Sequence, residues 1–125
     1  MINTLDVIWN YDTEIHPSKW KMVACIQPDC GYFFRINTRP WPPAIKLEKT
    51  PHHEFLKWDS YLECNRPLEL DEYTIEQSIK RTGVIGRIHA SLATGILAEV
   101  RTNITISLDD KSAIGIALGC VKINK

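Results

Sequence analysis

The amino-acid sequence predicts an α+β fold, with a small, bent antiparallel β-barrel in the N-terminal half and a C-terminal helical part packed on it. The main observation is a change of hydrophobic period near Pro67, from the alternation of strands to the 3.6-residue period of helices. Strands followed by helices, rather than alternating with them, are typical of α+β proteins. A length of 125 residues suits one core, so we expect a single domain, 1–125, with the barrel at about 6–64 and the helices at about 71–121.

Two apolar segments joined by a tight turn predict a β-hairpin over 20–37. Residues 20–26 (WKMVACI) are almost all apolar, which indicates a central strand covered on both faces. Residues 28–31 (PDCG) favour a turn, because proline presets φ, aspartate can bond its own backbone and glycine tolerates a positive φ. Residues 32–37 (YFFRIN) form the returning strand, and Val7–Trp9 is a short strand before the hairpin.

A rigid segment separates the hairpin from the remaining strands. Arg39–Pro43 (RPWPP) is rich in proline, which neither donates to a β-ladder nor continues a helix. Residues 44–48 then alternate apolar and charged side chains, the period of a half-buried strand. A polar loop around 51–53 leads to a last strand at 60–64.

Capping residues and apolar stripes predict three helices in the second half. Asp71 can cap a short helix that ends near Gly83. Residues 90–102 carry one apolar stripe and predict a second helix. Ser107–Asp110 is a variant of the capping box, with Asp in the place of Glu, and it begins a third helix.

The charge distribution allows two interpretations. The chain has 15 basic and 15 acidic residues, so its net charge argues neither for nucleic acid nor for a membrane surface. The stretch 16–58 is nevertheless locally basic and carries Trp20, Trp41 and Trp58. Such asymmetry can mark a nucleic-acid surface. The alternative is a solvated sheet face with ordinary tryptophans in the core.

The N-terminus lacks the basic leader and apolar run of a signal peptide, and no window is apolar for the roughly 18 residues that span a bilayer. We therefore expect a cytoplasmic protein with no membrane partner, whose four cysteines are reduced thiols. We expect neither a cofactor nor a metal, because the candidate zinc ligands lack the paired spacing of structural zinc sites. These candidates are Cys25, Cys30, His52, His53 and Cys64.

Basic and aromatic side chains in the barrel half could together form an RNA site. Arg and Lys can hold phosphates, and Trp or His can stack on unpaired bases. Trp41 lies in the stiff segment Arg39–Pro43, which can present its indole at little entropic cost. The alternative is that Trp41 only packs over the rim of the barrel.

Three stretches resemble the PemK/MazF-like toxins: Lys19–Ile26, Arg35–Thr38 and His53–Leu62. The resemblance lies in strand order and a few residues, and it covers about 6–64. Such toxins have an SH3-like barrel with attached helices, commonly form homodimers, and cleave single-stranded RNA without a metal. The resemblance implies these properties here, together with a cognate antitoxin protein as partner.

The resemblance also suggests catalytic residues. By position, Lys21 replaces an arginine of the family, Met22 the proline that follows it, and Thr38 matches a hydroxyl residue. Arg39 could supply the bidentate positive charge that lysine lacks, and His53 suits proton transfer near neutral pH. The catalytic candidates are Lys21, Thr38, Arg39 and His53. The nucleic-acid-binding candidates are Arg35, Trp41, His52 and Lys57.

Two functions follow from the sequence. One is a toxin-like endoribonuclease that cleaves single-stranded RNA without a metal. The other is a catalytically silent SH3-like barrel that binds a protein or nucleic acid. An antitoxin gene next to the gene for this protein would favour the first.

Overall fold

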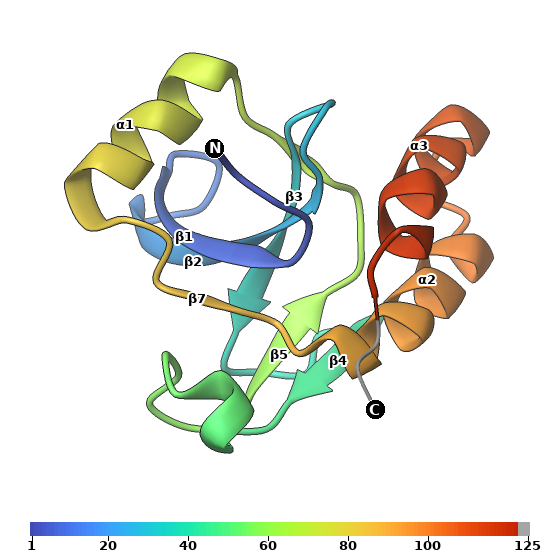
Figure 1. Ribbon diagram of the computed structural model, residues 1–125, viewed down its shortest axis with the longest axis horizontal. Helices are drawn as coiled ribbons and strands as arrows, with labels where there is room; N and C mark the ends of the chain where they lie inside the picture. The colour runs from blue at the N-terminus through green and yellow to red at the C-terminus, as the bar shows by residue number, and fades with distance from the viewer. Residues whose placement is uncertain (123–125) are drawn as a thin grey trace.

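The computed structural model describes residues 1–122 (Figure 1). Within them the chain forms one antiparallel β-sheet and three α-helices, which confirms the α+β prediction. The strands are β1 (Asp6–Asp12), β2 (Lys19–Gln27), β3 (Tyr32–Asn37), β4 (Ala44–Leu47), β5 (Ser60–Glu63), β6 (Leu68–Glu69) and β7 (Gly86–Arg87). The helices are α1 (Glu72–Thr82), α2 (Ala93–Thr102) and α3 (Leu108–Gly119), and two short 3-10 turns are η1 (Pro51–His53) and η2 (Ala90–Leu92).

The strands follow the order β4-β5-β3-β2-β1-β7, and β6 pairs with β3 beside this path. The predicted β2–β3 hairpin is confirmed, with Val23 opposite Arg35 and Cys25 opposite Phe33. Gly31 closes its turn: its N–H donates to the Pro28 carbonyl at 3.3 Å, and its φ is +70°.

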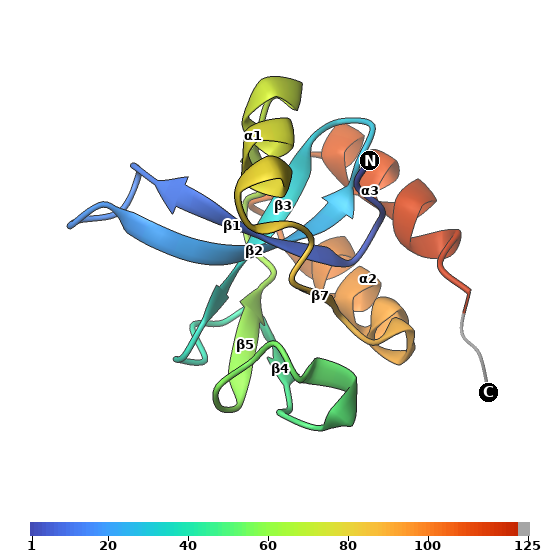
Figure 2. The ribbon, with the colours of Figure 1, turned by 60° about the vertical axis from the view of Figure 1, so that its left-hand side comes forward.

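The sheet is strongly curled, because β3 pairs along one edge with two separate strands. The end of β3 pairs with β5 and its start pairs with β6. As a result β4 and β5 turn away from the long ribbon of β1 and β2 (Figure 2). Among the described residues the path of strand pairs does not close into a ring, so the sheet is a half-barrel.

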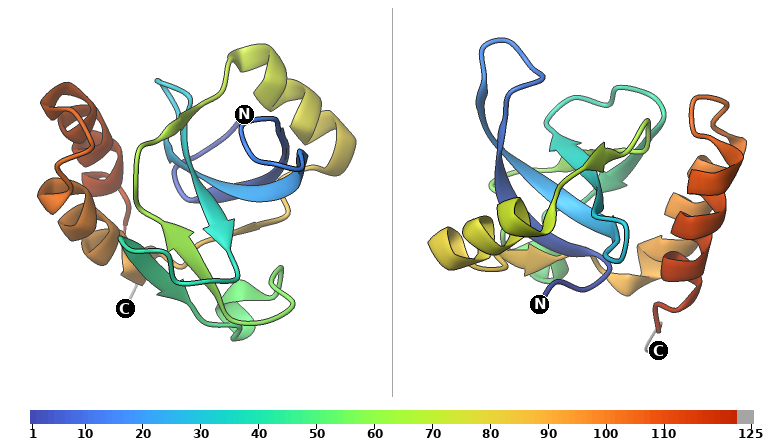
Figure 3. Two further views of the ribbon diagram at one scale, coloured as in Figure 1. Left: turned by 180° about the vertical axis from the view of Figure 1, so that it is seen from behind. Right: turned by 90° about the horizontal axis from the view of Figure 1, so that it is seen from above.

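α2 and α3 pack as a pair against one face of the sheet (Figure 3). Their buried residues Ile96, Val100 and Ile114 share one core cluster with Ala24 and Ile26 of β2. Two polar contacts also attach α3 to the hairpin: the Gln27 side chain donates to the Ala113 carbonyl at 2.7 Å, and the Tyr32 hydroxyl donates to Asp110 at 2.8 Å. The predicted packing of the C-terminal helices on the strands is therefore confirmed.

α1 covers the opposite face of the hairpin. Ile75 of α1 packs with Val23 and Cys25 in a second buried cluster. From Val23 to Ile26, β2 therefore places alternate side chains in two cores, which confirms the prediction of a strand covered on both faces for this part of 20–26. Trp20 is exposed and Lys21 is half-buried, so the start of the strand is not covered. The Asp71 carboxylate accepts from the Thr74 N–H at 2.7 Å, as predicted for the cap of α1.

Two strands were not predicted. β6 and β7 each contain two residues, which is too short for an alternating pattern. β7 pairs with the start of β1, so the chain crosses back to the sheet between α1 and α2. No helix within residues 1–122 combines the length and apolar character needed to cross a bilayer.

Candidate nucleic-acid interface

A cavity of about 360 Å³ lies where β2 begins and β3 ends, and we call it the Lys21 cavity. Lys19 and Lys21 are two residues apart on β2, and Arg35 and Asn37 are two apart on β3, so each pair points to one face of the sheet. Three other segments complete the lining. The β1–β2 connection contributes Ile15, His16 and Pro17, β5 contributes Glu63, and the segment after β3 contributes Trp41.

An ion pair between the buried Asp12 and the half-buried Arg35 fixes one wall of this cavity. The Arg35 guanidinium donates to the Asp12 carboxylate at 2.5 Å and to Glu14 at 3.3 Å. Burial by itself would raise the pKa of Asp12, but hydrogen bonds from Arg35 and the Glu14 N–H, with the charges of Arg35 and Lys21, lower it overall. Arg35 is therefore held in one orientation, with much of its charge already balanced.

Lys21 is the side chain with the most unusual environment in the cavity. Its ammonium donates to the Asn37 side-chain oxygen across the hairpin. Burial, followed by the charge of Lys19, lowers the pKa of Lys21, while Glu63 and Asp12 oppose the change. Lys21 consequently gives up its proton more readily than a solvated lysine does.

Three tryptophans of the barrel half are exposed, and one of them borders the Lys21 cavity. Trp20, Trp41 and Trp58 are 40%, 57% and 59% exposed, so the alternative that these tryptophans lie in the core is wrong. The Trp41 ring borders the Lys21 cavity and remains available for stacking. Trp20 is already engaged, because Tyr11 meets it edge to face at 5.4 Å and Arg81 lies 4.1 Å over its ring.

The predicted site residues fall into separate groups. Lys21, Arg35 and Trp41 line one cavity. Thr38 and Arg39 follow Asn37 directly and are exposed, but neither lines the cavity.

His53 lies in a different environment. Its ring is buried in η1, with Nδ1 2.8 Å from the Glu48 carbonyl and Nε2 accepting from the His89 N–H at 3.0 Å. Because Nε2 accepts this hydrogen bond, Nδ1 is the ring nitrogen that donates to the Glu48 carbonyl. His53 thus joins η1 to the segment before α2 and is not among the residues of the Lys21 cavity.

The remaining candidates also lie outside this cavity. The His52 ring packs on His89 with 4.0 Å between centroids, and it lines a small pocket with Arg87 and Lys122. Lys57 is exposed in the loop before β5.

The sequence did not single out His16, which the structure places in the Lys21 cavity. It lies in the β1–β2 connection and is exposed, and an imidazole can exchange protons near neutral pH. The one feature of the sequence that indicated a role for His16 at this site is its position three residues before the strand that carries Lys19 and Lys21.

Within residues 1–122, no group of three or more His, Cys, Asp or Glu side chains could hold a metal ion. Cys25 and Cys64 are buried in the core, whereas Cys30 and Cys120 are exposed. Burial raises the pKa of the Cys25 and Cys64 thiols to about 12.

No protein-family model, curated protein or solved structure matches this chain. The resemblance to PemK/MazF-like toxins therefore rests on the residues of the sequence alone.

Proposed function

We propose that this protein is a metal-independent endoribonuclease of the PemK/MazF-like toxin type, and that single-stranded RNA binds across the Lys21 cavity. One observation carries the proposal: a lysine with a lowered pKa shares a cavity with an imidazole and an exposed indole. The curled sheet is consistent with an SH3-like barrel, which belongs to the same proposal, as do a homodimer and a cognate antitoxin.

Binding would use the charge and the aromatic surface of the cavity. Lys19 and Lys21 attract a phosphate, and Trp41 offers a face on which one base can stack. A volume of about 360 Å³ is within the usual range of small-ligand sites, and the proposal seats one nucleotide unit there. Thr38 and Arg39 are exposed beside the end of β3, and in this proposal they would contact the neighbouring phosphate.

Cleavage would proceed by attack of the 2′-hydroxyl on the adjacent phosphorus. In this scheme His16 takes the 2′-hydroxyl proton, and Lys21 donates its proton to the leaving 5′-oxygen as the phosphorus–oxygen bond breaks. The products are a 2′,3′-cyclic phosphate and a 5′-hydroxyl end. A lowered pKa makes Lys21 a better proton donor, and its contact with Asn37 orients the ammonium.

The test is cleavage of single-stranded RNA by the purified protein in EDTA, with the new 5′-hydroxyl ends detected by kinase labelling. We expect Lys21→Met and His16→Ala each to lower the rate by about 10²–10⁴-fold. We expect Trp41→Ala to weaken RNA binding by about 5- to 150-fold, the equivalent of roughly 1–3 kcal/mol per stacked base. Lys80→Met removes an exposed lysine of α1 that lies outside the cavity, and this variant should cleave like wild type.

A catalytically silent binding module is the second candidate, and the charge balance favours it. Around the cavity Asp12, Glu14 and Glu63 oppose the three cations Lys19, Lys21 and Arg35. A wild-type protein that binds RNA or a protein through Trp41 but leaves RNA intact would support this second function and exclude the first.

A further inference from the structure

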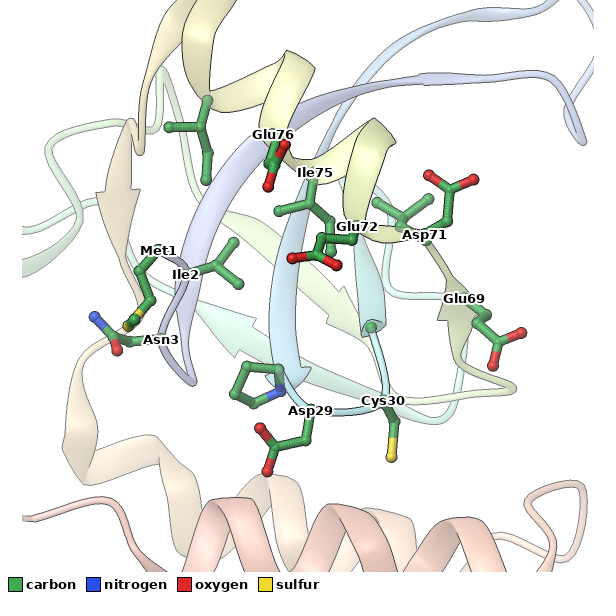
Figure 4. Close-up of a pocket in the computed structure, with 14 residues that line it drawn as sticks. Met1, Ile2, Asn3, Asp29, Cys30, Glu69, Asp71, Glu72, Ile75 and Glu76 are labelled. Atoms are coloured by element: carbon green, nitrogen blue, oxygen red, sulfur yellow. The ribbon is translucent and has the colours of Figure 1, made fainter.

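A pocket larger than the Lys21 cavity lies at the other end of the β2–β3 hairpin. It has a volume of about 950 Å³ and is formed by the hairpin turn, the chain before α1, one face of α1 and the N-terminal residues (Figure 4). We call it the acidic groove, because five carboxylates line it: Asp29, Glu69, Asp71, Glu72 and Glu76.

No Lys, Arg or His side chain lines this groove in the part of the chain that the structure describes. Asp71 is engaged as the cap of α1. The other four carboxylates form no ion pair with any residue of 1–122. The α-ammonium of Met1 is the one positive group among the described residues that line the groove, so the five carboxylates leave a local excess of negative charge.

The floor of the groove is apolar. On α1, Glu72, Ile75, Glu76 and Ile79 are spaced i, i+3, i+4 and i+7, so they form one stripe along the helix. Ile75 is buried, and Ile79 packs against the same core cluster as Ile2 and Leu70. Acidic side chains therefore border a floor of isoleucine and leucine, as Figure 4 shows around Ile2 and Ile75.

The spacing of the carboxylates favours a peptide over an ion. They come from the hairpin turn, β6 and α1, and the described residues contain no group of three that could hold a metal. Nucleic acid would be repelled by this charge. Separated carboxylates around an apolar floor match a segment that carries Lys or Arg on one side and apolar side chains on the other.

We propose that the acidic groove docks a basic, amphipathic segment of a partner protein. From Lys21 to Asp29 the chain advances eight residues, mostly along β2, or roughly 25 Å at the rise of a strand. The groove and the Lys21 cavity are thus separate sites at the two ends of one hairpin, and the docking proposal does not depend on the proposed nuclease activity.

Binding is tested with a fluorescein-labelled amphipathic peptide of Lys and Leu, followed by fluorescence anisotropy. The matched peptide carries Glu in place of Lys. We expect the basic peptide to bind and the acidic peptide not to bind. In the double variant Glu72→Gln/Glu76→Gln, Kd should rise at least fivefold. The control double variant Glu48→Gln/Glu54→Gln removes two exposed carboxylates outside the groove and should leave Kd within twofold.

Thiol protection locates the bound peptide in the same experiment. Cys30 lines the groove and Cys120 does not, and both are exposed. A saturating basic peptide should slow the reaction of Cys30 with a thiol reagent at least fivefold and leave Cys120 within twofold. The proposal is overturned if wild type does not bind the basic peptide, if both double variants weaken binding equally, or if Cys30 is not protected.

Discussion

The ion pair between Asp12 and Arg35 keeps a buried carboxylate charged and fixes one wall of the Lys21 cavity. Asp12 ends β1 and is buried, while Arg35 reaches it from β3 across the intervening strand β2. An isolated buried carboxylate would be costly, so the guanidinium and the Glu14 N–H are needed to keep Asp12 charged. The same contacts hold the wall of the Lys21 cavity in place.

Replacing Asp12 by Asn tests this pair through the pH dependence of stability. The pKa of Asp12 in the folded protein lies below its ordinary 3.8, so the charged form contributes stability above that pH and loses it as the pH falls further. We expect Asp12→Asn to be less stable by about 1.5–3 kcal/mol at pH 7, the usual value of a charge-assisted hydrogen bond. This difference in the free energy of unfolding between wild type and Asp12→Asn, measured by urea unfolding, should become smaller below pH 3.8. An equal gap at pH 7 and pH 3 would contradict this assignment.

The β2–β3 hairpin connects most parts of the molecule. Its turn borders the acidic groove, its open end borders the Lys21 cavity, and α1 and α3 contact its two faces. Gly31 in the turn has a φ of +70° and lies against Leu70, whose N–H donates to the Gly31 carbonyl at 2.8 Å. The geometry of the turn therefore sets the position of the chain that leads into α1.

Gly31→Ala should disturb this turn more than a similar change elsewhere. A Cβ at position 31 would collide with the Leu70 carbonyl oxygen and would also be strained by the positive φ. We expect a loss of about 2–4 kcal/mol in the free energy of unfolding, from backbone strain and overpacking together. Gly119→Ala is the control, because nothing lies within 4 Å of its Cβ. It should remain within about 1 kcal/mol of wild type. Equal effects of the two variants would rule out the steric explanation.

Over the whole molecule, one core joins the sheet to the helix pair. Its buried members come from each of the strands β1 to β5 as well as from α2 and α3. Because the same apolar cluster spans both halves of the chain, we expect the strands and helices to unfold together, as a single domain would.

Ile96→Ala tests this coupling. Ile96 is fully buried on α2, so its truncation should cost about 2–5 kcal/mol, while Ile116→Ala on the exposed side of α3 should cost less than about 0.5 kcal/mol. Helical circular dichroism and tryptophan fluorescence should report the same denaturation midpoint in each variant. Helices that melt before the fluorescence changes would indicate a separable helical unit.

Local patterns were sufficient to predict the hairpin, the three helices and their order. Turn residues such as Gly31, the cap at Asp71 and the apolar stripes act over a few neighbouring positions, so they can be read from the sequence directly. The apolar run at 20–26 also indicated a strand covered on both faces, and the structure confirms this for 23–26. Strands as short as β6 and β7 carry no such pattern.

The grouping of the candidate residues needed the folded chain. Lys21 and Arg35 come together because β3 lies beside β2, and Trp41 joins them from the segment after β3. His53 was also a candidate site residue, but it is buried elsewhere by contacts with Glu48 and His89. The acidic groove likewise collects carboxylates from the hairpin turn, β6 and α1. Charge and residue type are local properties, but the distance between side chains that are far apart in the chain depends on strand pairing and helix packing.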